Sequence, residues 1–221
     1  MIQINRNTLK AVSRFSAAKD IRYYLNGVYV QASPSETRLA ATNGHILAVH
    51  TTAHTGENAN GGFADLIIPA DTVSAILKIK PSSKYLETVT LSQDNGTWKA
   101  EFSGMSVAFI PLDGKFPDYT RVIPRELSGV VGQYQPELLS RCQDALGDLN
   151  GKKTDRFIEI KHNGTGAALV DMGMDNMIVV IMPFRVQNNS PIDTAWAFVP
   201  VAVPVAAPVA APVDTGETVT A

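Results

Sequence analysis

A threefold internal repeat constrains the fold of this chain more than any other feature. Short apolar strands begin near Ile2, Leu66 and Val130, at equal intervals along the sequence. Each strand precedes a predicted helix of about three turns, and each helix precedes segments in which apolar and polar residues alternate. One such unit cannot bury both its helix and its sheet face, so the three units are expected to pack side by side.

Caps, prolines and alternation set the expected boundaries of the elements. The helices are predicted at residues 8–18, 71–78 and 136–146, with Asn7 or Thr8 as the first cap and proline in the first turn of the third helix, where it is tolerated. The strands after them are predicted at 24–32, 38–42, 46–51, 88–91, 98–102, 106–111, 157–161, 167–172 and 177–183. Asn95-Gly96 and Asn163-Gly164 are interpreted as hairpin turns. The sequence thus predicts β-α-β-β-β three times, an α+β class.

Charge is unevenly distributed along the chain. The net charge of −2 gives no global positive field that would mark a nucleic-acid binder. Residues 1–24 nevertheless hold five lysines and arginines against one acid, whereas the remainder holds 14 against 20. A basic N-terminal element therefore precedes an acidic body.

The C-terminal segment is apolar but rich in proline. No charge occurs from Trp196 to Val213, while Pro200, Pro204, Pro208 and Pro212 recur at every fourth position. Proline at this spacing excludes a helix, and an irregular backbone cannot span lipid, so no membrane contact is expected. Residues 191–221 are predicted to form an extended or disordered tail.

The single cysteine and the polar N-terminus point to the cytoplasm. Cys142 excludes an internal disulfide and is interpreted as a buried helix residue rather than a nucleophile. The N-terminal sequence has no signal-peptide pattern. We therefore expect a cytoplasmic protein.

No catalytic or metal constellation is apparent, so neither an enzyme nor a cofactor is predicted. His45, His50 and His54 are close in sequence but poorly placed on a strand to share one metal ion. Asp113 and Asp118 could serve acid–base chemistry. They lie in a Gly/Pro-rich loop, however, where aspartate is favoured for turn geometry alone.

Four ordered motifs resemble the bacterial or phage DNA polymerase III β subunit, the β sliding clamp. Three resemble the family's middle domain: Arg22-Tyr23-Tyr24-Leu25-Asn26-Gly27, Ala41-Thr42-Asn43-Gly44-His45-Ile46-Leu47-Ala48 and Asp113-Gly114-Lys115-Phe116-Pro117-Asp118-Tyr119. Met182-Pro183-Phe184-Arg185 is similar to the motif that closes its C-terminal domain. The resemblance covers residues 1–185 and implies the DNA clamp fold, with helices on one side and antiparallel sheets on the other.

The resemblance implies three segments and two binding regions. Residues 1–124 match the middle domain, 125–190 half of the C-terminal domain, and 191–221 form the tail. Carried over residue by residue, the family's peptide cleft comprises Leu25, Thr42, Gly44, His45, Leu47, Pro117, Arg121, Val122, Met182, Pro183, Phe184 and Arg185. The DNA contact comprises Lys10, Arg14, Lys19, Arg22, Tyr23 and Tyr24. Ile46 stands where the family usually has arginine, and Glu137 lies near an expected aromatic.

Each region also has a simpler interpretation. The cleft's apolar residues could be ordinary core, and the cations and tyrosines could form a solvated helix and a strand start. The expected partners are duplex DNA, bound without sequence preference, and peptides of DNA polymerase and clamp loader. A second hypothesis is a non-encircling module that competes with the host clamp for its partners.

Self-association is expected through the third unit. Half of a family domain normally packs on a sister unit, and the chain has no second copy of it. Its helix 136–146 and strands such as 177–183 would therefore expose apolar faces. The alternative cover is the chain's own tail.

Overall fold

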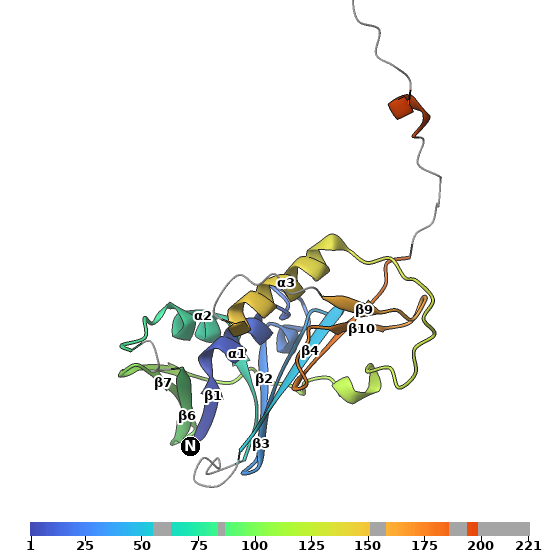
Figure 1. Cartoon of the computed structure of the whole chain (residues 1–221). Helices are drawn as coiled ribbons and strands as arrows, with labels where there is room; N and C mark the ends of the chain where they lie inside the picture. Colours follow the sequence, from blue (N-terminus) through green and yellow to red (C-terminus); the bar gives the residue numbers. More distant parts are fainter. Residues whose placement is uncertain (55–62, 84–86, 151–157, 186–193, 199–221) are drawn as a thin grey trace, which may run out of the picture. The chain divides into compact units, whose positions relative to one another are not determined.

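The computed structural model describes residues 1–54, 63–83, 87–150, 158–185 and 194–198 (Figure 1). Met1–Arg185 form one compact unit, and Val186–Ala221 form a second. In the second unit the described residues include one short 3-10 helix, η4 (Ala195–Phe198). The remainder of the predicted tail lies outside the described residues. No helix in the described ranges is long and apolar enough to span a membrane.

Two antiparallel sheets organise the compact unit. The smaller runs in the order β1 (Ile2–Asn5), β6 (Thr88–Asp94), β7 (Thr97–Phe102) and β8 (Met105–Phe109). The larger runs in the order β5 (Ala64–Pro69), β2 (Gly27–Ala32), β3 (Glu36–Thr42), β4 (Ile46–Ala53), β11 (Met177–Ile181), β10 (Ala168–Asp171) and β9 (Glu159–Lys161). The first two units therefore exchange opening strands, since β1 pairs with β6 and β5 with β2.

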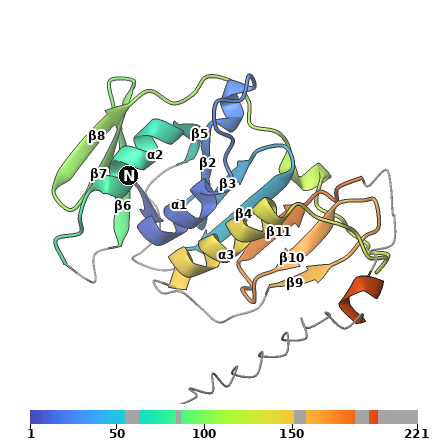
Figure 2. The same cartoon turned by 90° about the horizontal axis from the view of Figure 1, so that it is seen from above.

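Three helices lie together on one side of the sheets (Figure 2): α1 (Arg6–Ser13), α2 (Ala70–Lys78) and α3 (Pro136–Asn150). Alternation along β4 explains the two layers. Ile46 and Ala48 belong to the core cluster that contains the helices, whereas Leu47 and Val49 belong to a second cluster on the other face. The clamp-type arrangement predicted from the sequence, with helices on one side, is the arrangement observed.

The first helix starts and ends earlier than predicted. Asn5 is its N-cap, because the Asn5 side chain accepts hydrogen bonds from the backbone N–H groups of Asn7 and Thr8 at 2.8 and 3.1 Å. The expected caps, Asn7 and Thr8, thus supply donors rather than the acceptor. The helix ends at Ser13, and residues 14–18 form turns and bends instead.

Several strand boundaries also differ from the prediction. A 3-10 turn, η1 (Tyr23–Leu25), occupies the expected start of the second strand, which begins at Gly27. Gly27 lies so close to the Ile68 carbonyl that a Cβ there would approach its oxygen to 2.3 Å. The Asn95-Gly96 turn is confirmed between β6 and β7, with both residues at positive φ. Asn163-Gly164 lies in a longer connection between β9 and β10.

The third unit lacks the opening strand expected near Val130. Residues 128–134 belong to no sheet, and Val130 and Val131 are 61% and 75% exposed. Their segment is held by isolated backbone hydrogen bonds, including Gly129 N–H to His162 O at 3.1 Å. The prediction was wrong because the first two units supply opening strands to each other, and the third unit has no such counterpart among the described residues.

The apolar faces of the third unit are covered, contrary to the expectation of an exposed surface. β11 pairs with β4 along its whole length, from Met177 to Ile181. On α3, Leu138, Cys142 and Leu146 are at most 4% exposed and share one core cluster with Phe15. The first unit contributes to this cover, because residues of α1 and β4, such as Leu9 and Ile46, belong to the same core cluster. The buried position of Cys142 is as predicted.

Candidate functional site

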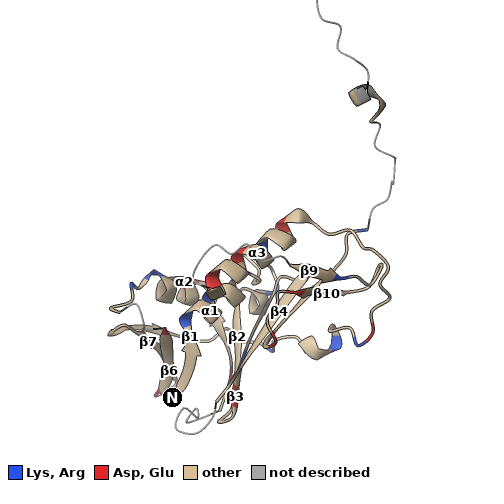
Figure 3. Cartoon of the chain, viewed as in Figure 1, with Lys and Arg blue, Asp and Glu red and all other residues tan. Residues whose placement is uncertain are grey.

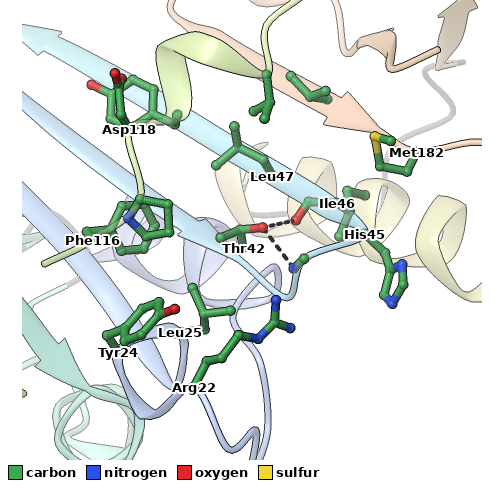
Figure 4. Close-up of a pocket in the computed structure, with 15 residues that line it drawn as sticks. Arg22, Tyr24, Leu25, Thr42, His45, Ile46, Leu47, Phe116, Asp118 and Met182 are labelled. Carbon is green, nitrogen blue, oxygen red and sulfur yellow. Dashed lines mark hydrogen bonds between the residues drawn. The ribbon is translucent and has the colours of Figure 1, made fainter. Parts of the chain in front are cut away.

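A cleft of about 220 Å³ lies on the side of the larger sheet opposite the helices. It forms where the start of β4 and the end of β11 are crossed by the segment after residue 115 (Figure 4). Eight residues of the cleft inferred from the sequence line it: Leu25, Thr42, Gly44, His45, Leu47, Pro117, Val122 and Met182. Side chains from opposite ends of the compact unit's sequence, such as Leu25 and Met182, thus meet at one surface.

Four residues assigned to the cleft from the sequence do not line it: Arg121, Pro183, Phe184 and Arg185. Seven others do: Arg22, Tyr24, Ile46, Phe116, Asp118, Tyr119 and Val180. All of these except Val180 stand within the motifs already quoted. The period of two along β11 could have identified Val180, because it shares a strand face with Met182.

The turn between β3 and β4 forms a rigid floor of the cleft. The Thr42 hydroxyl donates to the Ile46 carbonyl at 2.7 Å and accepts from the Gly44 N–H at 3.0 Å. The Asn43 side-chain oxygen accepts from the N–H groups of His45 and Ile46. The His45 carbonyl in turn accepts from Met182 N–H at 2.9 Å. These bonds join the β4 turn to the end of β11, so the cleft is preorganised.

An aromatic stack anchors the opposite wall. The ring of Phe116 stacks on Tyr29 of β2, with centroids 4.8 Å apart and planes 2° from parallel. Burial, followed by a hydrogen bond with Asp65, raises the pKa of Tyr29 to about 12. Both Tyr29 and Phe116 are at most 9% exposed. The backbone N–H of Leu112 also donates to Ile67 O at 3.0 Å, which fixes the segment that carries Phe116 to β5.

Arg22 reaches the rim of the cleft but is paired with an acid. Its guanidinium donates to both carboxylate oxygens of Asp20 at 3.0 and 2.8 Å. These hydrogen bonds lower the pKa of Asp20 to about 2. The guanidinium also lies against Gly44, whose φ of +90° and missing side chain make room for it. Arg22 was assigned to DNA from the sequence, and the structure places it at the cleft.

The loop between α1 and β2 holds three more residues that were assigned to DNA contact from the sequence: Lys19, Tyr23 and Tyr24. Lys19 has a φ of +58° and is exposed, and Tyr23 is 51% exposed. Tyr24 lines the cleft and packs edge-on against Tyr23, with centroids 5.8 Å apart. Gly114 sits against both tyrosines, with the nearest atoms 3.5 Å from where its Cβ would be. The loop thus presents a lysine and an aromatic ring beside the cleft.

Lys10 of α1 and Arg14 at its C-cap, both assigned to DNA, form ion pairs with acids of α3. Figure 3 shows the acidic positions along α3. Lys10 Nζ lies 2.7 Å from Asp148, and Arg14 binds both Asp148 and Asp144. Burial alone would raise the pKa of Asp148, but hydrogen bonds and charges from Arg14 and Lys10 outweigh it and hold that pKa below its ordinary value. This pairing was not visible in the sequence, because Arg14 and Asp148 lie far apart along the chain.

Other titratable groups are dispersed. Among the described residues, no three His, Cys, Asp or Glu side chains are placed to hold a metal ion. His45 is exposed, His50 is 5% exposed and lies on the helix side of β4, and His54 contacts the Thr37 hydroxyl. Burial raises the pKa of the Cys142 thiol to about 12, which disfavours a reactive thiolate.

Comparison with known proteins identifies the family. The model of the DNA polymerase III beta subunit, central domain, matches residues 3–118. The beta sliding clamp of Caulobacter vibrioides is 29% identical over 147 residues, which are 64% of this chain and 38% of the relative. That of Vibrio cholerae is 32% identical over 52% of this chain and 31% of its own length. The chain thus spans about a third of the length of these curated relatives.

A solved structure of a DNA polymerase III beta subunit has a similar fold. The DNA polymerase III subunit beta of Pseudomonas aeruginosa superposes with a TM-score of 0.63 at 19% identity, covering 84% of this chain and 66% of that structure. At this identity the match supports the fold alone. With the family model matching more than half of the sequence, the chain belongs to the DNA polymerase III beta subunit family, whose curated relatives are the beta sliding clamps.

Proposed function

We propose that this chain is a non-catalytic, sliding-clamp-like processivity factor that binds replication proteins through the cleft and duplex DNA without sequence preference. The observation that carries the proposal is the convergence of three distant segments, around Leu25, Leu47 and Met182, on one preorganised apolar cleft. Because the chain belongs to the clamp family, we expect it to act together with a DNA polymerase. The proposed location is the cytoplasm.

The cleft has the chemistry of a site for a short hydrophobic peptide. Its walls are apolar, Met182 is flexible and 42% exposed, and Arg22 and Asp118 supply polar groups at the rim. A volume of about 220 Å³ is below the roughly 300–1,000 Å³ of small-molecule sites. It suits one or two anchoring side chains better than a whole ligand. The proposed partners are the peptides of polymerases and clamp loaders.

Replacing Met182 with glutamate tests the cleft. Met182→Glu places a charge at an apolar wall, and we expect peptide affinity to fall at least tenfold, about 1.4 kcal/mol or more. The matched control is Ile178→Glu, because Ile178 is also 42% exposed and lies on the same strand face, outside the cleft. Fluorescence anisotropy with a labelled clamp-binding peptide gives both affinities. No affinity in the unmodified protein, or equal losses in both variants, would contradict the assignment.

A second candidate is the non-encircling competitor of a host clamp. The pairing of Lys10 and Arg14 with acids of α3 favours it, because these cations are then not free for phosphate. Both functions use the cleft, but only the processivity factor also binds duplex DNA. Binding to a duplex that falls steeply with salt supports the processivity factor, whereas peptide binding without any DNA binding supports the competitor.

A further inference from the structure

Two acids of helix α3, Asp144 and Asp148, form ion pairs with Lys10 of α1 and with Arg14 at its C-cap. Asp148 uses one carboxylate oxygen for Lys10 and the other for Arg14, and its side chain is only 8% exposed. Asp144 adds a second acid to Arg14 at 3.2 Å. A DNA phosphate would have to displace a partly buried carboxylate before it could bind these cations.

The position of α3 is fixed by packing and by hydrogen bonds. Arg141 donates from Nη1 to the carbonyl oxygens of Arg14 and Ser16 at 3.0 and 3.4 Å, where the end of α1 leaves carbonyl groups without helical partners. From Nη2 it donates to Glu137 at 2.9 Å. With Leu138 and Leu146 in the core, the acids stay opposite the cations.

The helical side is consequently close to neutral. The three helices and the C-cap of α1 carry five cations and four acids, namely Arg6, Lys10, Arg14, Lys78 and Arg141 against Asp71, Glu137, Asp144 and Asp148. Arg6 is set apart, since its guanidinium donates to the carbonyl oxygen of Leu77 and lies over the ring of Phe102. Non-specific duplex binding needs unpaired cations, and this side offers little net charge.

We propose that α3 masks α1 from nucleic acid, so that Asp144 and Asp148 occupy the place of two DNA phosphates and duplex contact is confined to the loop with Lys19 and Tyr23. The proposal rests on the proposed DNA-binding function and specifies which part of the surface performs it. The masked face becomes available only when the two acids are neutralised or displaced.

The test is the salt dependence of duplex binding by Asp144→Asn/Asp148→Asn. Two released cations can contact two phosphates, which steepens the slope of log affinity against log salt by about 1.8. Between roughly 50 and 200 mM salt, the loss of affinity should then exceed that of the unmodified protein by roughly tenfold. Asp144→Asn alone should give a smaller change in slope, because Asp148 still pairs with both cations. Circular dichroism checks that each variant folds.

The matched control carries the same change of charge elsewhere. Asp94 and Glu159 pair with Lys99 and Lys161 on the sheets, so Asp94→Asn/Glu159→Gln should leave the slope unchanged. Lys10→Gln should alter binding in the Asp144→Asn/Asp148→Asn background and not in the unmodified protein. An equal rise in the control, or sensitivity of the unmodified protein to Lys10→Gln, would overturn the masking proposal.

Two further outcomes separate masking from the proposed function. If the unmodified protein binds duplex DNA through Lys19 and Tyr23 but Asp144→Asn/Asp148→Asn adds nothing, the masking proposal fails and the DNA-binding function stands. If neither form binds DNA while both bind the peptide, the DNA part of the function fails together with the masking proposal.

Discussion

At the scale of single residues, Gly44 links the conformation of the turn between β3 and β4 to the position of Arg22 at the cleft. Its φ of +90° is a conformation that a side chain disfavours, and a Cβ would come within 2.9 Å of the Arg22 guanidinium. Glycine at this position therefore does two things. It permits the turn that Thr42 and Asn43 stabilise, and it lets Arg22 lie at the rim of the cleft.

Gly44→Ala and Gly96→Ala separate these two roles. Gly96 has a similar φ of +83°, but nothing lies within 4 Å of its missing Cβ. Both substitutions should lower the free energy of unfolding by about 1–2 kcal/mol, because both force alanine into a left-handed conformation. Only Gly44→Ala should also weaken peptide binding, by displacing Arg22. Urea unfolding and anisotropy measure the two effects, and equal peptide affinity in both variants would argue against a role for Arg22.

At the scale of elements, the β4–β11 pairing joins the third unit to the first. Next to it, Thr51 N–H donates to Asn176 O at 2.9 Å, and the Asn176 side-chain nitrogen lies 3.1 Å from His50 Nε2. A neutral His50 ring can accept that bond. Burial lowers the pKa of His50, since the charged ring would lose its hydration.

The stability of the chain should therefore decrease as pH falls through the ordinary histidine pKa of 6.5. A lowered folded-state pKa means that the unfolded chain binds the proton first, so the stabilisation is present above pH 6.5 and is lost below it. His50→Gln should flatten this dependence, whereas His45→Gln, at an exposed position, should retain it. Urea unfolding across this pH range provides the measurement. The same slope in His50→Gln would assign the pH dependence to another group.

At the scale of the whole molecule, the third unit remains the proposed site of self-association, although its main apolar face is buried. In the first two units, the strand after each helix is bordered by the opening strand of the other unit. β9, at the end of the larger sheet, has a neighbour on only one side among the described strands. The exposed Val130 and Val131 stand where an opening strand was expected.

The full chain should therefore have a mass above that of a monomer in light scattering. Val131→Asp should lower the association, because it places a charge in the exposed apolar segment that contains Val130 and Val131. The control is Met105→Asp, because Met105 is 58% exposed and lies on the edge strand β8 of the other sheet. It should leave the association through the third unit unchanged. A version that ends at Arg185 tests the tail. If it is monomeric and folded at high concentration, self-association through the third unit is excluded.

The local chemistry of the sequence determined the helices and most strands, because caps, turns and alternation act between near neighbours in the chain. Asn95-Gly96 marked its turn correctly, since only a few residue types accept two successive positive φ values. The threefold repeat and the quoted motifs likewise identified the fold class and eight residues of the cleft. These signals depend on residues close together in the sequence, so they can be interpreted without the tertiary structure.

Tertiary structure alone decided which units share strands and which charges meet. Ile2 pairs with Leu91, and the acids of α3 neutralise Lys10 and Arg14, although the sequence presents those cations as free. Val130, predicted as a strand, has no strand partner because strand pairing requires a neighbour from another unit. Hydrogen bonding in sheets and ion pairing act between segments far apart in the chain, so neither can be derived from local pattern. The sequence therefore specified the units, and their packing specified the surfaces that are open to partners.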